Sequence, residues 1–428
     1  MKNIEEVFGV SNKQIESYIE RPNVDDKFVD GLKAKKHIIV YGASKQGKTA
    51  LTNKHLDEDQ FIRVDCAPNT RPIDIYKSVL RQLNVEFKEE SRISHKNEVK
   101  GRAEIKASVN IPFLSSFSAK ARAEKNSGEE QQMTFKPVEY NLNLAQDISE
   151  IIKAYDFSNH IILENFHYLD EDVQQQLAFD LRVFEDHKVI FIILGIWREK
   201  NRLAQFNGDL LDRIVEVPVE PWDNEDFIRV IKEGEPLMNV DFSQVQDKMI
   251  EATFDSIGVF QELCKHSCIK AGINKTKEGE TYTITSEELA NAISQKLDDY
   301  SARHIRSIET FIEQKAKSSQ DKPLYIAYYF IKETFLNLPE DITDGFKRKS
   351  VHELIKKNHH RPDDVRASDL TYFLHNIVPN QIKKKIIPPI FDYDRSTRLL
   401  KIIDSTFYFF LQNVDREDFV ESLSNPLE

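Results

Sequence analysis

The stretch HIIVYGASKQGKTAL, residues 37–51, determines how the rest of the chain is interpreted. Its first five residues are an apolar run typical of a buried parallel strand. The next eight, Gly42–Thr49, fit the pattern G-x-x-x-x-G-K-[ST]. Gly42 and Gly47 permit backbone angles that are closed to other residues, so the amides between them can form a nest for phosphate oxygens. The strand before the motif and the helix expected after it argue against a chance match and predict a nucleotide-binding P-loop.

Two side chains of this motif carry the chemistry. Lys48 places a point charge on the β- and γ-phosphates of ATP, and Thr49 offers its hydroxyl to Mg²⁺. The helix that starts here directs its positive end at the same phosphates. We therefore expect ATP and Mg²⁺ as cofactors, with Lys48 also counted as catalytic. The candidate nucleotide contacts are Gly42, Ala43, Ser44, Lys45, Gln46, Gly47, Lys48, Thr49 and Leu51, with Arg21 from the upstream segment.

Composition bounds the class of protein. The 428 residues suggest two or three domains, and a chain that is 40% hydrophobic and 30% charged is globular. No run of 18 apolar residues predicts a transmembrane helix, and the N-terminus lacks the features of a signal peptide, so we expect a cytoplasmic protein. Of three cysteines, Cys264 and Cys268 lie four apart on an expected helix and are interpreted as core thiols. The net charge of -12 argues against a generally basic nucleic-acid binder and leaves room for a local basic patch.

The order of expected elements gives an α/β core with two further regions. Strands at 61–66, 160–163, 189–195 and 216–219 alternate with helices, which is typical of a parallel sheet covered on both faces. We expect a lead-in over 1–35, a P-loop core over 36–223 with an insertion at 93–140, and a helical lid over 224–300. A link over Tyr300–Lys317 leads to the region 301–428, where three helices precede two strands, the order of a winged helix.

The insertion shows strict alternation. Apolar or small residues occupy the odd positions from Val99 to Phe113 and resume over Phe117–Ala123, which predicts a β-hairpin with its turn near Leu114–Ser116. Residues Gly128–Gln132 are expected to form a mobile loop. The hairpin can pack on its own domain, or its small, Ala-rich face can pack against a neighbouring subunit; a membrane pore is the least favoured interpretation.

An acidic residue ends the expected strand at 160–163. Glu164 stands where P-loop ATPases hold Mg²⁺ through water, and Asn165 stands where a second acid usually activates the attacking water. Because an amide is a poor general base, nucleotide binding is better supported than fast hydrolysis. The alternative is that Glu164 is simply a carboxylate at a strand end. We take Thr49 and Glu164 as the metal ligands, and Glu164 and Asn165 as catalytic positions.

Arginines later in the core are candidates for contact with phosphate. Arg198 follows the strand that ends at Gly195; it can act as a sensor or pair on the surface with Glu199. Arg213 precedes the last strand, where an arginine can reach the nucleotide of the next subunit; the alternatives are a pair with Asp212, or Arg202 in that role.

The C-terminal region is locally basic. Residues 344–401 contain thirteen Lys and Arg against seven Asp and Glu, although the chain is acidic. Such a patch suits contact with a phosphate backbone. The expected recognition helix, ASDLTYFLHNI, is poorly basic, so a protein-binding winged helix with a solvated face is weighed equally.

Together these features resemble the AAA+ family and its STAND-like bacterial relatives. The matching residues are Gly42–Thr49, Glu164-Asn165, Arg213 and the helical bundle after Trp222, over about Phe8 to Ala271. The segments YIERPNVDD, ENFHYL and GIWRE are similar to ATPases of anti-phage systems. In relatives the segment YIERPNVDD lies against adenine; here an ordinary turn is equally open.

The resemblance implies an AAA+-like fold and an oligomerising regulatory ATPase that is expected to be slow and to act through a separate effector protein. Related proteins commonly read ED where this chain has Glu164-Asn165, and Gly258–Glu262 occupies the helix expected to carry a sensor arginine. Two alternatives stay open: a DNA-binding loader, transposition regulator or initiator-like ATPase, and a nucleotide-dependent scaffold that does not hydrolyse ATP.

Overall fold

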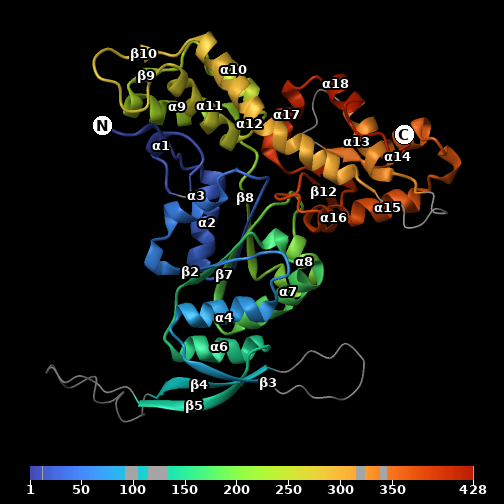
Figure 1. Ribbon diagram of the computed structural model, residues 1–428. Coiled ribbons are helices and arrows are strands. Elements are labelled where there is room, and N and C mark those ends of the chain that lie inside the picture. Colours follow the sequence, from blue (N-terminus) through green and yellow to red (C-terminus); the bar gives the residue numbers. More distant parts are fainter. Residues whose placement is uncertain (12, 92–104, 114–133, 315–322, 338–344, 428) are drawn as a thin grey trace.

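A five-stranded parallel sheet is the centre of the α/β core, seen in the middle of Figure 1. The computed structural model describes residues 1–11, 13–91, 105–113, 134–314, 323–337 and 345–427. The strand order is β2-β6-β7-β1-β8, all parallel. The strands are β1 (His37–Tyr41), β2 (Phe61–Asp65), β6 (His160–Glu164), β7 (Ile190–Gly195) and β8 (Ile214–Pro218). The predicted P-loop α/β core is therefore confirmed.

Helices cover both faces of this sheet. Their bounds are α2 (Pro22–Ala34), α3 (Lys48–His55), α4 (Pro72–Gln82), α6 (Ala145–Ala154), α7 (Glu171–Asp186) and α8 (Arg202–Phe206). Helices α2 and α3 pack on one face with Ile38, Val40 and Ile162, and α4, α6 and α7 pack on the other with Ile39 and Ile161. Because the strands are parallel, their carboxyl ends meet at one edge, where the P-loop follows β1 and Glu164 ends β6.

The insertion forms a three-stranded antiparallel sheet in the order β3-β4-β5, below α6 in Figure 1. The strands are β3 (Phe87–Ser91), β4 (Ile105–Phe113) and β5 (Thr134–Asn141). The alternating strand is present, with Ala107 and Val109 buried toward the core. Its described partners differ from the predicted one: β4 pairs with β3, and Phe113 lies opposite Thr134. The predicted turn at 114–116 and partner strand at 117–123 lie outside the described residues.

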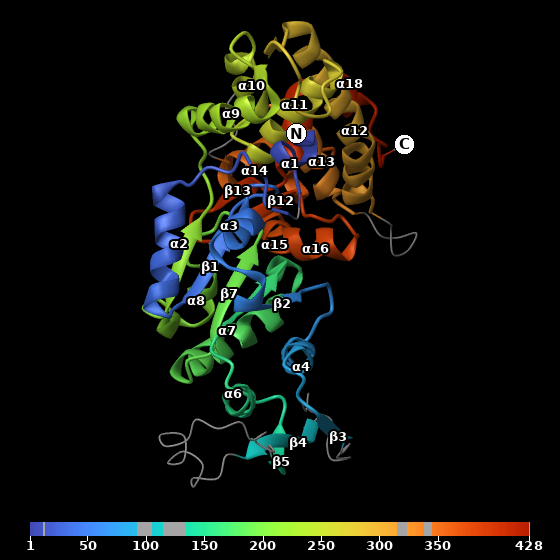
Figure 2. The same ribbon diagram turned by 90° about the vertical axis from the view of Figure 1, so that its left-hand side faces the viewer.

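The lid follows the core and packs with the N-terminus, as the two views in Figures 1 and 2 show. It contains α1 (Ile4–Val7), α9 (Asn224–Met238), α10 (Gln246–Thr253), α11 (Ile257–Lys270) and the short pair β9 (Val240–Asp241) and β10 (Tyr282–Thr283). Cys264 and Cys268 are buried in its hydrophobic cluster. Helix α12 (Ser286–Ile312) is continuous through residue 300, so the link expected over Tyr300–Lys317 is helical as far as Ile312.

The C-terminal region has its own hydrophobic cluster. Its elements are α13 (Ile326–Leu336), β11 (Phe346–Lys347), α14 (Arg348–Asn358), α15 (Ala367–His375), α16 (Ile377–Lys383), β12 (Phe391–Asp394), β13 (Leu399–Ile402), α17 (Ser405–Asn413) and α18 (Arg416–Glu421). The antiparallel sheet is ordered β11-β13-β12. The sequence predicted three helices and two strands here; β11, α16, α17 and α18 were not anticipated.

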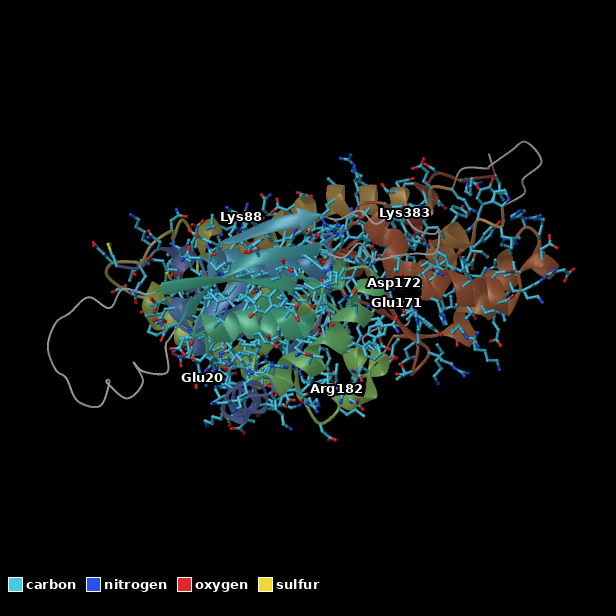
Figure 3. The ribbon with its side chains drawn as sticks, turned by 90° about the horizontal axis from the view of Figure 1, so that it is seen from below. Glu20, Lys88, Glu171, Asp172, Arg182 and Lys383 are labelled. Atoms are coloured by element: carbon cyan, nitrogen blue, oxygen red, sulfur yellow. The ribbon has the colours of Figure 1, made fainter. Side chains whose placement is uncertain are left out.

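This region lies beside the core in Figure 3, which labels Glu171 at the junction. There Arg395 donates two hydrogen bonds to the carboxylate of Glu171, 2.9 and 3.1 Å long. Within the described ranges, no helix is both long enough and apolar enough to cross a membrane.

Candidate nucleotide-binding site

The P-loop connects β1 to α3. Gly47 has φ +85°, a left-handed conformation that favours glycine, and directly precedes the first residue of α3. The ammonium group of Lys48 turns into the loop and donates to the carbonyl oxygens of Gly42 and Ala43, at 3.0 and 2.6 Å. Desolvation lowers the pKa of Lys48 to about 8, against the opposing effect of Glu220 and Glu164. A cationic amine thus lies inside the loop, where a phosphate would stabilise its charge.

Two oxygen ligands suitable for a divalent cation lie beside Lys48. The Thr49 hydroxyl is 3.4 Å from a carboxylate oxygen of Glu164, and Arg63 donates to the same oxygen at 3.0 Å. Burial raises the pKa of Glu164, and the neighbouring Arg63 opposes this shift. Hydroxyl and carboxylate oxygens are the ligands that Mg²⁺ prefers, so the predicted pair fits the metal. Arg63 was not singled out from the sequence.

The residue after Glu164 is an amide in a turn. Asn165 adopts φ +57° and directly precedes a 3-10 turn over Phe166–Tyr168. The next carboxylate along this edge belongs to the neighbouring strand: Asp65 ends β2 and is the register partner of Glu164. The sequence placed a strand here, but its terminal aspartate was not considered as part of the site.

A cavity of about 200 Å³ lies against the P-loop and is lined by the lead-in and the lid. Leu51 and Arg21, two of the predicted nucleotide contacts, both line it. The Arg21 guanidinium lies 3.6 Å from the ring centroid of Trp222 and donates to the carbonyl of Val219 at 2.8 Å. Arg21 therefore forms one wall of the cavity, between the lead-in and the loop after β8.

The lid touches the P-loop directly. A Cβ at Gly258 would lie 2.5 Å from the Cβ of Lys45 and 2.6 Å from its carbonyl oxygen. Only glycine permits this approach, so an arginine cannot occupy position 258 at the start of α11. The amide of Ile257 donates to the side-chain oxygen of Gln46 at 3.3 Å. The side-chain oxygen of Gln46, in the P-loop, is thereby hydrogen-bonded to the lid.

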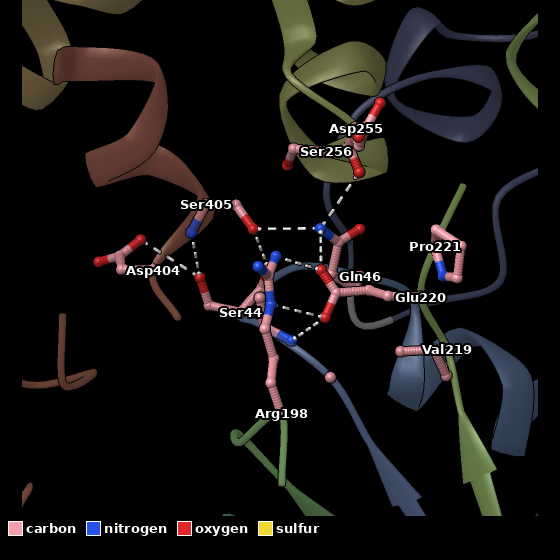
Figure 4. A network of polar contacts seen from close by, with 12 residues as sticks. Ser44, Gln46, Arg198, Val219, Glu220, Pro221, Asp255, Ser256, Asp404 and Ser405 are labelled. Atoms are coloured by element: carbon pink, nitrogen blue, oxygen red, sulfur yellow. Dashed lines mark hydrogen bonds and ion pairs between the residues drawn. The ribbon is translucent and has the colours of Figure 1, made fainter. Parts of the chain in front are cut away.

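A carboxylate from the loop after β8 binds the outer side of the P-loop (Figure 4). Glu220 accepts from the amide of Ala43 at 2.7 Å and from Gln46 at 3.1 Å. Arg198 donates to the same carboxylate at 2.7 Å. The partner of Arg198 is thus Glu220 and not Glu199, which accepts from Gln205 at 2.9 Å. Arg198 is placed next to the P-loop, with its charge already paired.

The C-terminal region also binds the P-loop (Figure 4). The Ser44 amide donates to the carbonyl of Ile403 at 2.9 Å, and its hydroxyl donates to Asp404 at 3.2 Å. In return the Ser405 hydroxyl donates to the carbonyl of Ser44 at 2.7 Å, and Gln46 donates to Ser405 at 3.3 Å. We call Ile403, Asp404 and Ser405 the C-terminal clamp. The sequence placed these three residues in no functional site.

The remaining predicted arginines lie elsewhere. Arg213 precedes β8, at the edge of the sheet opposite the P-loop, and pairs with Glu185 and, at 2.6 Å, with Asp186. The expected alternative partner, Asp212, is not the one observed. Arg202 lies 3.7 Å from Asp392 of the C-terminal region. Arg213 therefore cannot reach the nucleotide of its own chain.

Comparison with known proteins gives structural similarity only. No family model matches the sequence. No curated protein matches it either. A Walker-type ATPase of Pyrococcus abyssi aligns over 94% of this chain and 97% of its own, at 13% identity and TM-score 0.48. The Orc1 protein of Aeropyrum pernix in complex with DNA aligns over 93% and 94%, at 10% identity and TM-score 0.42. A STAND protein of Pyrococcus horikoshii with a tetratricopeptide repeat sensor aligns over 95% of this chain and 44% of its own, at 12% identity and TM-score 0.36.

Proposed function

We propose that this chain is an ATP-binding, oligomerising regulatory ATPase that acts as a nucleotide-controlled switch. One observation carries the proposal: the C-terminal clamp is hydrogen-bonded to Ser44 and Gln46, inside the loop that would hold the phosphates. A ligand that changes the conformation of this loop also changes the surface that the C-terminal clamp contacts. A ligand shifts a conformational equilibrium by its differential affinity for the two states. ATP is such a ligand if the clamped and released loops bind it unequally.

The residues of the site have distinct roles in this proposal. The P-loop amides and Lys48 bind the phosphates, and Arg21 and Leu51 help to form the wall of the neighbouring cavity. Thr49 and Glu164 would hold Mg²⁺, which when bound neutralises charge on the phosphate oxygens. Asn165 lacks a basic oxygen, so residue 165 does not itself activate the attacking water, and the rate of hydrolysis sets how long the ATP-bound state lasts.

Assembly completes the proposed site. Arg213 lies at the sheet edge away from its own P-loop, so a nucleotide that it contacts would belong to a neighbouring subunit. Release from Glu185 and Asp186 would be required first. We propose a homo-oligomer in which Arg213 contacts the neighbour's phosphates and the sheet β3-β4-β5 contributes to the subunit contact.

The ATP-binding part of the proposal has a direct test. Lys48→Ala removes the charge that lies in the backbone nest, so we expect loss of ATP binding with the fold retained. A fluorescent ATP analogue is titrated into the wild type and the variant, and circular dichroism checks the fold. Lys33→Ala, at an exposed lysine on α2, is the control for charge removal. Equal affinity of wild type and Lys48→Ala would refute the P-loop assignment.

A DNA-binding loader or initiator-like ATPase is the second candidate. Asp392 and Asp394 are buried, so two of the seven acidic residues between 344 and 401 do not offset the basic residues at the surface. We propose that α13 to β13 form a winged helix that contacts nucleic acid or a protein. Binding to duplex DNA is measured at several salt concentrations; a steep loss of affinity with salt supports phosphate contact. A protein that binds no DNA in either nucleotide state excludes this candidate.

The biological setting we propose is phage defence, with a separate effector protein. Its support is the resemblance of YIERPNVDD, ENFHYL and GIWRE to ATPases of such systems. Cells carrying the gene with its neighbouring genes are challenged with phage, alongside cells carrying Lys48→Ala. Equal plaque counts in all cells would contradict the defence role.

A scaffold that does not hydrolyse ATP is a further candidate. Intact ATP binding without hydrolysis would favour it.

A further inference from the structure

The strand next to Glu164 ends in a second carboxylate. Asp65 is the last residue of β2, which pairs in parallel with β6, and its register partner is Glu164. The amide of Cys66 continues the ladder by donating to the carbonyl of Glu164 at 2.9 Å. The backbone position of Asp65 is thus fixed beside the metal-binding acid.

Alternation along β2 fixes the face on which Asp65 lies. Ile62 and Val64 belong to the cluster under α4, α6 and α7, whereas Phe61 packs against the cluster under α2 and α3. Arg63 shares the face of Phe61, since its guanidinium donates to Asn53 of α3 at 3.0 Å and to Glu164. Successive side chains in a strand point to opposite faces, so Asp65 shares this face too.

The two neighbouring carboxylates differ in their surroundings. The Glu164 side chain is 12% exposed and is engaged by Thr49 and Arg63. Asp65 is exposed to solvent at the carboxyl end of its strand. One acid is therefore arranged to hold a cation, and the other can be reached by water.

We propose that Asp65 is the catalytic carboxylate that orients the attacking water, in place of the acid absent at Asn165. The inference rests on the proposed ATPase function. The water oxygen forms a bond to the γ-phosphorus, and the bond from phosphorus to the β–γ bridging oxygen breaks. The water proton passes to Asp65 and then to solvent, and the products are ADP and inorganic phosphate. This position supplies the basic oxygen that an amide at residue 165 lacks.

The test compares Asp65→Asn with wild type and with Asp59→Asn, a matched change at an exposed aspartate of the turn before β2. Single-turnover hydrolysis and ATP affinity are measured at matched oligomer state. The nucleotide retained by the protein is identified by chromatography. We expect Asp65→Asn to slow hydrolysis by ~10²–10⁴-fold. Its affinity for ATP should be unchanged, and ATP should be retained where wild type and Asp59→Asn retain ADP.

The outcomes separate this inference from the proposed function. Hydrolysis by Asp65→Asn at the wild-type rate overturns the inference and leaves the ATPase intact. A wild type that binds ATP without hydrolysing it also overturns the inference. A parallel fall in affinity and rate shows that Asp65 acts in binding, which overturns the catalytic role. Failure of the wild type to bind ATP refutes the proposed function itself.

Discussion

At the scale of single residues, the protonation of Lys48 couples ATP binding to pH. Its ammonium group is held by the carbonyls of Gly42 and Ala43 and is desolvated, which lowers its pKa to about 8. Above this pH the nucleotide-free protein loses the charge, whereas bound phosphates would favour the charged form. Binding must then take up a proton, and linkage makes affinity fall as pH rises.

We predict that ATP affinity is constant below pH 8 and falls above it by at most about tenfold per pH unit. The same titration with Lys48→Met, which keeps the length of the side chain without a titrating group, should be weaker and independent of pH. Fluorescence titration between pH 6.5 and 9.5 measures both. A wild-type affinity that rises or stays flat above pH 8 would contradict the assigned role of this ammonium group.

Residue 165 gives a second prediction at this scale. Asn165→Asp and Asn165→Glu restore an acid after Glu164 and should raise the single-turnover rate of hydrolysis. A positioned general base contributes typically ~10²–10⁴-fold, and the gain over wild type is the part that Asp65 does not already supply. Asn165→Ala is the control for loss of the amide. A fast wild type that the acids leave unchanged or slow would show that residue 165 is not at the position of the base.

The sequence predicted those parts of the site that are contiguous or lie at a strand end. The P-loop is one run of residues, and Glu164 ends an apolar run, so both could be proposed from the sequence. Contacts with distant residues were missed for a physical reason: Glu220 lies 177 residues from Ala43, and Asp404 lies 360 residues from Ser44. Neither partner has a sequence pattern of its own, and only the packing of three regions around the loop brings them there.

At the scale of elements, strand β4 joins the inserted sheet to the core. Ala107 and Val109 are buried in the main hydrophobic cluster, and α6 packs on the same sheet. Alternation correctly identified this strand, because burial of one face imposes a period of two. It did not predict that β4 pairs with β3 and β5. The choice of partner strands depends on where the chain returns and not on the pattern within one strand.

This packing predicts the effect of a small change in β4. Val109→Ala leaves a cavity in a fully buried position and should lower the free energy of unfolding by about 1–3 kcal/mol. Ser108→Ala, on the opposite face of the same strand, should change it little. Urea denaturation of both variants measures the difference. Equal midpoints would show that the inserted sheet does not share the core's stability.

A consequence for assembly follows from the same strand. Deletion of residues 97–126 would remove β4 and expose apolar residues of α6. A loss of oligomers in that variant could then result either from a lost subunit contact or from a destabilised core. Assembly is better tested by Lys106→Glu, on the exposed face of β4. We expect this variant to fold normally and to assemble less with ATP, as measured by light scattering. Wild-type assembly would argue against a subunit contact through this face.

At the scale of the whole molecule, the P-loop lies where core, lid and C-terminal region meet. Helix α12 connects the last two without interruption: its first half packs in the lid cluster and its last turns pack in the C-terminal cluster. The clamp is held in turn by α12, since Arg303 donates to Asp404 at 2.7 Å. Burial would raise the pKa of Asp404, but Arg303, His304 and Thr406 together keep it below the ordinary value. Asp404 is therefore a stable anion between the P-loop and α12.

This arrangement predicts that weakening the clamp alters nucleotide binding. Ser405→Ala removes the hydroxyl that donates to the Ser44 carbonyl and accepts from Gln46, while the ion pair of Asp404 remains. A buried hydrogen bond contributes about 0.5–1.5 kcal/mol net, so loss of the contact should change ATP affinity by about 2–13-fold. If the clamp favours the nucleotide-free conformation of the loop, Ser405→Ala binds ATP more tightly than wild type. In the absence of ATP, hydrogen exchange over residues 403–413 should then be faster in Ser405→Ala than in wild type. Ser422→Ala is the control, because that hydroxyl bonds locally to Phe419. Identical affinity and exchange in the two variants would show that the C-terminal region rests on the P-loop without being coupled to its ligand.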